Sequence, residues 1–119
     1  MKRSTVNDYY AFQEQRVKKF SDLCKLPFSY QYTGGGCDAI YGETSTHRIF
    51  ITNDANVPNA NEEHYVGVYN KNDDDLVAEC CAKNRAELLA AFSSIKTLDE
   101  LVSFLIGDGF NGFTNITAL

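Results

Sequence analysis

An acidic β-hairpin is predicted by residues 64–81, which read HYVGVYNKNDDDLVAECC. Its two arms, His64–Tyr69 and Leu76–Cys81, are rich in β-branched, aromatic and small apolar residues. The polar run 70–75 between them has the composition of a turn. In the first arm Tyr65, Gly67 and Tyr69 share one face, because side chains alternate along a strand, and His64, Val66 and Val68 share the other.

Three further strands are predicted upstream of this hairpin. Residues 28–32 alternate with period two, residues 37–41 form a second short segment, and in residues 47–52 Ile49 and Ile51 face away from Phe50. The glycine run 34–36 and the turn 42–46 separate them. Connections this short cannot hold a parallel crossover, so we expect an antiparallel meander of about five strands.

Helices are predicted at both ends of the chain. An apolar stripe runs from about Asn7 to Cys24, and Pro27 ends that helix. Capping-box patterns start two C-terminal helices, at Asn84-x-x-Glu87 and Thr97-x-x-Glu100. The predicted fold class is therefore α+β, an antiparallel sheet with an N-terminal helix and a C-terminal helical pair, in a single globular domain of residues 1–119.

The remaining segments are a C-terminal stop and a tail. Gly107 follows the last apolar stripe and is expected to end that helix. The tail 108–119 is expected to dock on the domain, because Phe110 and Phe113 would be costly to leave in water.

Charge is distributed unevenly along the chain. Residues 1–26 carry six basic and three acidic side chains, which is a net charge of +3. Because the whole chain has a formal net charge of −5, residues 27–119 carry a net charge of −8. An acidic body disfavours direct nucleic-acid binding, which needs Lys and Arg against the phosphates, and it permits a basic protein partner. The basic start leads into no apolar stretch, so we expect a cytoplasmic protein without a signal segment or membrane span.

Motifs for catalysis or for metal or cofactor binding are missing from the sequence. The four cysteines, Cys24, Cys37, Cys80 and Cys81, form no C-x-x-C spacing and are expected to be reduced thiols. Cys80 and Cys81 should point to opposite faces of their strand. Cys37, beside the glycine run, could act as a nucleophile with His47 or His64 as its base, but a tight turn is the favoured interpretation. We therefore expect no metal, no cofactor and no enzyme activity.

The acidic hairpin is the candidate binding site. Three adjacent carboxylates repel one another, so they must stay in water or meet basic groups. Tyrosines nearby could add contact area, since tyrosine is enriched at interfaces. The expected partner-binding residues are Asp73, Asp74, Asp75, Tyr65, Tyr69, Glu62 and Glu63. The alternative is a solvated turn beside ordinary strand tyrosines.

Three functions are compatible with these residues. We favour a small acidic, non-enzymatic binding or inhibitor protein that occludes the basic groove of a partner. In size, charge and lack of motifs the chain is similar to small acidic proteins of phages and mobile elements, such as anti-CRISPR and anti-restriction proteins. The alternatives are a thiol-dependent enzyme centred on Cys37 and a self-associating structural or accessory domain.

Overall fold

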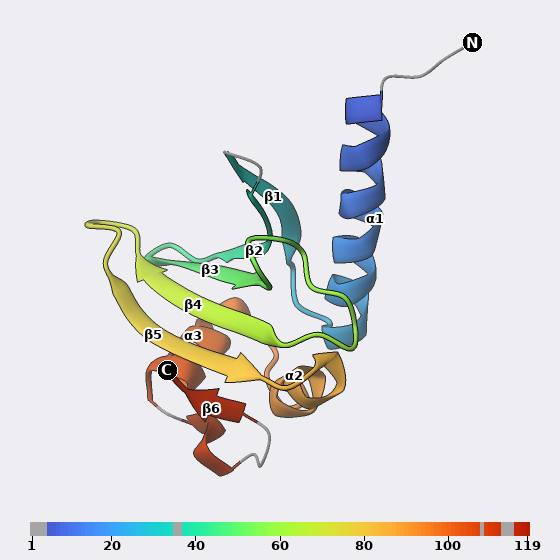
Figure 1. Cartoon of the computed structure of the whole chain (residues 1–119). Coiled ribbons are helices and arrows are strands. Elements are labelled where there is room, and N and C mark those ends of the chain that lie inside the picture. Colours follow the sequence, from blue (N-terminus) through green and yellow to red (C-terminus); the bar gives the residue numbers. More distant parts are fainter. Residues whose placement is uncertain (1–4, 35–36, 108, 113–115) are drawn as a thin grey trace.

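Six antiparallel strands form one sheet in the order β1-β2-β3-β4-β5-β6, as the computed structural model of the chain shows (Figure 1). The structure describes residues 5–34, 37–107, 109–112 and 116–119. Its elements are α1 (Thr5–Cys24), β1 (Ser29–Gly34), β2 (Cys37–Glu43), β3 (His47–Thr52), β4 (His64–Asn70), β5 (Leu76–Ala82), α2 (Arg85–Phe92), α3 (Leu98–Ile106), the 3-10 helix η1 (Gly109–Gly112) and β6 (Ile116–Ala118). The α+β class and the antiparallel meander are confirmed.

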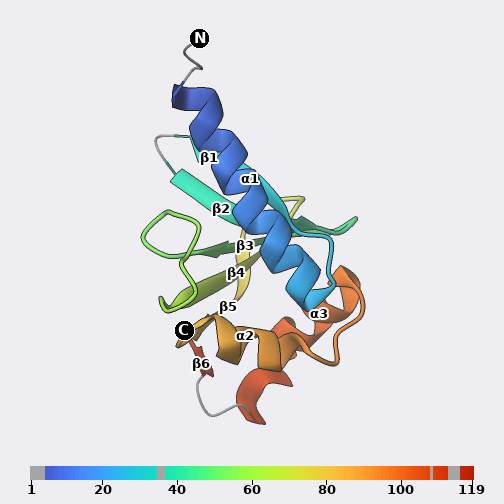
Figure 2. The same ribbon diagram turned by 90° about the vertical axis from the view of Figure 1, so that its right-hand side faces the viewer.

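The helices of this fold all cover the same face of the sheet. Ile40, Ile51 and Val66 are paired across β2, β3 and β4, and each is fully buried. They join one hydrophobic core with residues of all three helices, among them Phe20 of α1 and Leu101 of α3. Figure 2 looks onto α1, which crosses in front of β1 and β2, with α2 and α3 below it. The opposite face of the central strands therefore has none of the described helices over it.

The N-cap half of each predicted capping box forms. The Asn84 side chain accepts a hydrogen bond from the backbone N–H of Glu87, and Thr97 accepts one from Glu100, so each helix start is satisfied locally. Gly107 is the C-cap of α3. Cys80 lies in the core while Cys81 lies on the other face of β5, which confirms that the two neighbours diverge.

The tail adds a strand that the sequence did not predict. Ile116–Ala118 pairs with β5 as β6, and Ile116 is buried in the core. Phe110 of η1 is also buried, at 2% exposure, so the docked tail is confirmed for this residue. Phe113 and two of the three glycines at 34–36 lie outside the described residues.

A loop from residue 53 to residue 63 connects β3 to β4 and is held by two arginines. Arg16 of α1 donates to the backbone oxygens of Val57 and Pro58, and Arg85 of α2 donates to Pro58 as well. Arg85 Nε also donates to Nε2 of the fully buried His64, at 3.3 Å. These bonds fix the loop against the helical side of the fold.

No helix in the described part of the chain has the length and apolar character that a membrane crossing needs.

Candidate functional site: the open face of the sheet

Three aromatic side chains stand in a row across the uncovered sheet face, here called the open face. This aromatic row consists of Tyr41 on β2, Phe50 on β3 and Tyr69 on β4. Ring centroids are 5.1 Å apart between Tyr41 and Phe50 and 5.7 Å apart between Phe50 and Tyr69. These are tilted and edge-to-face geometries, which aromatic pairs prefer. Each of the three side chains is only half-buried.

The pairing register of β2, β3 and β4 brings these three side chains next to one another. Phe50 is paired with Tyr41 on one side and with Gly67 on the other. Gly67 has no side chain, and the Tyr69 ring occupies the space beside it: a Cβ atom added there would lie 3.1 Å from Tyr69 Cε1. A glycine at this position therefore lets Tyr69 lean toward Phe50 and complete the row.

Two hollows flank the row. One, of about 440 Å³, is bordered by Tyr41, Phe50 and Tyr69 together with Gln31, Tyr32, Arg48 and Asp74. The other, of about 320 Å³, lies between Phe50 and Tyr69 on one side and Cys37, Ala39, Thr52 and Ala55 on the other. Phe50 and Tyr69 border both hollows, so their rings form the ridge between two shallow depressions of side-chain size.

Ion pairs border one end of the open face. Arg48 Nη1 lies 2.6 Å from Asp74 Oδ1, and Lys71 Nζ lies 2.7 Å from Glu43 Oε2. The Tyr41 hydroxyl donates to Glu43 as well. Lys71 is the main reason that the pKa of Glu43 is lowered, and burial followed by the Glu43 hydrogen bond raises the pKa of Tyr41. This end of the face is thus a charged network that joins the exposed carboxylates of Asp74 and Glu43 to the half-buried cations Arg48 and Lys71.

The acidic hairpin tip contributes to this network through one of its three carboxylates. Asp74 pairs with Arg48, Asp73 accepts a hydrogen bond from the backbone N–H of Asp75 at 3.0 Å, and Asp75 is exposed. Asp74 has a φ of 59°, in the left-handed region, which aspartate tolerates in turns. The tip is therefore both a turn and part of the site's border.

Of the other predicted binding residues, some lie on the open face and one lies in the loop of residues 53–63. Tyr69 is in the row, and Tyr65, on the same face of β4, donates to Glu63 at 3.2 Å. That bond is the main cause of the raised pKa of Tyr65. Glu62 instead accepts from the backbone N–H of Asn59 within the 53–63 loop, so it caps that loop rather than bordering the row.

Five residues of the aromatic row and its bordering ion pairs were not predicted as binding residues: Tyr41, Glu43, Arg48, Phe50 and Lys71. The sequence did contain a signal for Phe50, because the alternation of side chains along residues 47–52 places its ring on the face opposite Ile49 and Ile51. Without a helix known to cover that side, an apolar side chain there could not be distinguished from core.

Neither histidine lies where a base for Cys37 would be needed. Cys37 begins β2 on the open face, whereas His64 is buried on the helical face of β4. His47 starts β3 at the other end of the β2–β3 pair, beside Thr46. Among the described residues no group of three or more His, Cys, Asp or Glu is arranged to hold a metal ion.

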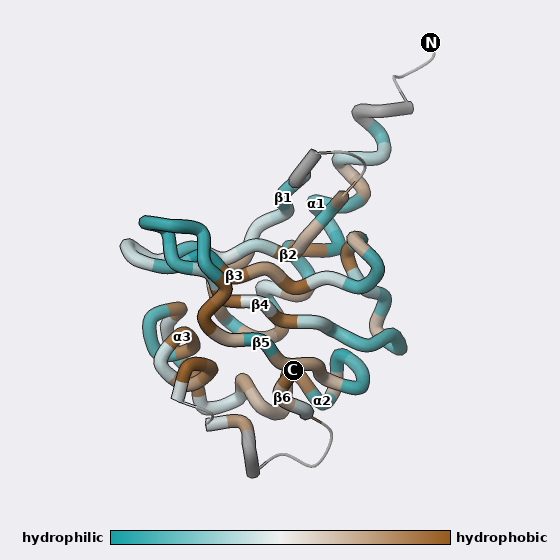
Figure 3. Tube along the Cα trace, turned by 60° about the vertical axis from the view of Figure 1, so that its left-hand side comes forward, coloured by the Kyte–Doolittle hydropathy of each residue, from teal (hydrophilic) through white to brown (hydrophobic). Residues whose placement is uncertain are grey.

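The hydropathy of the residues differs between the strands and the turns of the sheet. Figure 3 shows hydrophobic positions along the central strands and α3, and hydrophilic turns at the end of the sheet.

No protein-family model, curated protein or solved structure matches the chain.

Proposed function

We propose that this chain is a non-enzymatic binding protein that holds a basic protein partner on the open face. The observation that carries the proposal is the aromatic row of Tyr41, Phe50 and Tyr69, half-exposed on a sheet face that none of the described helices covers. Aromatic side chains gain most when a partner removes them from water, and they are enriched among residues that dominate binding energy. A ridge between two hollows suits anchor side chains entering from each side.

Charge at the border of the face favours a basic partner. Six carboxylates lie on or beside it, and the cations among them are Arg48 and Lys71. The carboxylates belong to Glu43, Glu63, Asp73, Asp74, Asp75 and Glu79. A partner's Arg or Lys could lie over the aromatic rings and compete with Arg48 for Asp74. Long-range attraction would speed the encounter, while the rings would slow dissociation.

Inhibition by occlusion is the activity that such binding supports best. A basic groove that normally holds nucleic acid would be blocked by carboxylates that replace phosphates. This is the mode of action expected for small acidic proteins of the anti-CRISPR or anti-restriction kind.

A capture experiment with matched variants tests the proposal. Wild-type protein and Phe50→Ser are immobilised and exposed to extract of the native host, with Phe12→Ser as control. Phe12 is 57% exposed on α1, so both variants remove an aromatic ring, but only one removes it from the open face. We expect a partner retained by wild type and by Phe12→Ser and lost from Phe50→Ser. Equal retention by all three proteins would refute the assignment of this face.

The acidic border is tested on the same partner by rate measurements. Changing Asp73, Asp74 and Asp75 to Asn should slow association and flatten its salt dependence, since border charges act mainly on the encounter. A control variant removes the same charge from α2 and α3, through Glu87→Gln, Asp99→Asn and Glu100→Gln. If both variants slow association equally, net charge is responsible and the hairpin has no specific role.

A further inference from the structure

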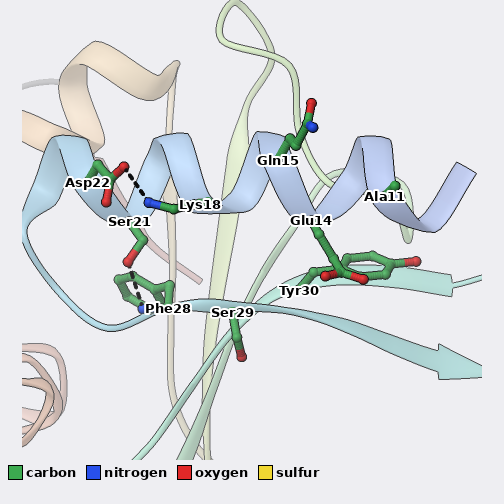
Figure 4. A pocket seen from close by; sticks show the side chains of 9 residues that line it. All are labelled: Ala11, Glu14, Gln15, Lys18, Ser21, Asp22, Phe28, Ser29 and Tyr30. Atoms are coloured by element: carbon green, nitrogen blue, oxygen red, sulfur yellow. Dashed lines mark hydrogen bonds and ion pairs between the residues drawn. The ribbon is translucent and has the colours of Figure 1, made fainter. Parts of the chain in front are cut away.

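A second recess lies between α1 and the edge of the sheet, and Figure 4 shows it from close by. It encloses about 680 Å³ and shares no lining residue with the two hollows of the open face. One wall is α1, through Ala11, Glu14, Lys18 and Asp22, and the other is the start of β1 with Phe28 and Tyr30. It is therefore a groove separate from the proposed partner site.

The β1 wall is a free strand edge. β1 is the first strand of the sheet, and within the described part of the chain it pairs with β2 alone. Ser29, Tyr30 and Gln31 make no backbone hydrogen bond to any described residue outside β2. On such an edge alternate residues present both N–H and C=O outward, which is the template that an added strand uses.

The α1 wall carries an acidic group that faces the groove. Groove-lining residues recur every three or four positions along α1, which makes one continuous stripe. Lys18 Nζ is paired with Asp22 Oδ2 at 3.2 Å, so these two charges offset each other. Glu14 has no hydrogen bond or ion pair with the described residues and extends from α1 toward Tyr30 (Figure 4). The groove thus has a net negative charge, centred on Glu14.

We propose that this groove binds an extended basic segment of a partner protein, added as a strand along β1 with a Lys or Arg side chain toward Glu14. The stripe from Ala11 to Asp22 is about 16 Å long at the rise of an α-helix, which matches a strand of about five residues. Main-chain hydrogen bonds to β1 would hold the segment, and Glu14 would select its charge. A second copy of this chain fits less well, because pairing two β1 edges would bring together two acidic molecules of net charge −5.

The test uses a synthetic peptide of about seven residues in which Lys alternates with Val, titrated into ¹⁵N-labelled protein and followed by amide NMR shifts. We expect the shifts to gather at β1 and at the Glu14 stretch of α1. Glu14→Lys should weaken binding about tenfold or more, as loss of a charge pair does. Asp99→Lys, the same charge change at the start of α3, should leave most of the affinity. A peptide methylated on its central backbone nitrogens should not bind, because it cannot donate to β1.

Four results would overturn the proposal. They are the absence of any shift, shifts confined to the open face, equal binding of the N-methylated peptide, and equal binding of a peptide with Glu in place of Lys. Shifts of β1 amides that grow with protein concentration and without peptide would assign the edge to a second copy of this chain instead.

Discussion

Acidification from about pH 7.5 to about pH 4.5 is expected to destabilise the fold through one side chain, His64. This residue is fully buried beneath the Phe20 ring, with ring centroids 6.4 Å apart. Its Nδ1 lies 2.8 Å from the backbone oxygen of Glu62 and therefore donates. Its Nε2 accepts from Arg85 and is the atom that would take a proton. Protonation of Nε2 would place the positive charge of His64 beside the guanidinium of Arg85, and the two charges would repel each other away from solvent.

The magnitude follows from the shift in pKa. Burial, and after it the charge of Arg85, lowers the pKa of His64 from 6.5 to about 4, against the opposing effect of the Glu62 oxygen. The unfolded chain takes up a proton near pH 6.5, whereas the folded chain does so only near pH 4. The free energy of unfolding therefore falls as pH falls through this window, and His64 contributes roughly 2–3 kcal/mol of the loss at pH 4.5.

Urea unfolding at both pH values measures this effect. Carboxylates also titrate in this range and shift the urea midpoint of both proteins. The effect of His64 is therefore the difference between wild type and His64→Gln in how far the midpoint falls from about pH 7.5 to about pH 4.5. The wild-type midpoint should fall about 1–2 M further than that of the variant. His47→Gln is the matched control, because His47 lies at the start of β3 beside Thr46 and should keep the full wild-type response.

Parallel pH dependence in wild type and His64→Gln would refute this reasoning. It would mean that folded and unfolded chains take up the His64 proton at the same pH, so that at about pH 4.5 Nε2 would be protonated and could not accept from Arg85. Strand β4 would then lose one of its attachments to α2.

Three further predictions concern the described contacts. Thr97→Ala should cost about 1 kcal/mol in denaturant unfolding, because the hydroxyl caps Glu100 at 3.1 Å; a neutral result would place the cap elsewhere. Phe110→Ala should cost about 3 kcal/mol or more, since that ring is almost wholly buried, and wild-type stability in that variant would show an undocked tail. Cys80 and Cys81 should resist alkylation in the folded protein at neutral pH, because burial raises their thiol pKa values to about 12 and about 11. Rapid native-state labelling of either cysteine would contradict their burial.

Local signals in the sequence predicted the parts of the fold that depend on neighbouring residues. The caps at Asn84 and Thr97 each need only the residue three positions on, and both form. The alternation in residues 64–69 likewise assigned Tyr65 and Tyr69 to the face opposite Val66. Such features are decided by backbone geometry within one turn or one strand.

Features that depend on distant residues could not be predicted. Asp74 pairs with Arg48, 26 positions earlier, and nothing local indicates that contact. Strand β6 has three residues and exists because β5 offers an edge beside it. Which sheet face the helices cover is decided by the whole core, so the exposure of Phe50 and Tyr41 was not predictable from the strands alone.

The central claim, that the open face is where a partner binds, is tested most directly by mapping amide NMR shifts in ¹⁵N-labelled protein when the captured partner is added. The largest shifts are predicted along the three strands that hold the aromatic row, at and around Tyr41, Phe50, Gly67 and Tyr69. Shifts confined to α1, α2 and α3, with these strand amides unchanged, would contradict the claim.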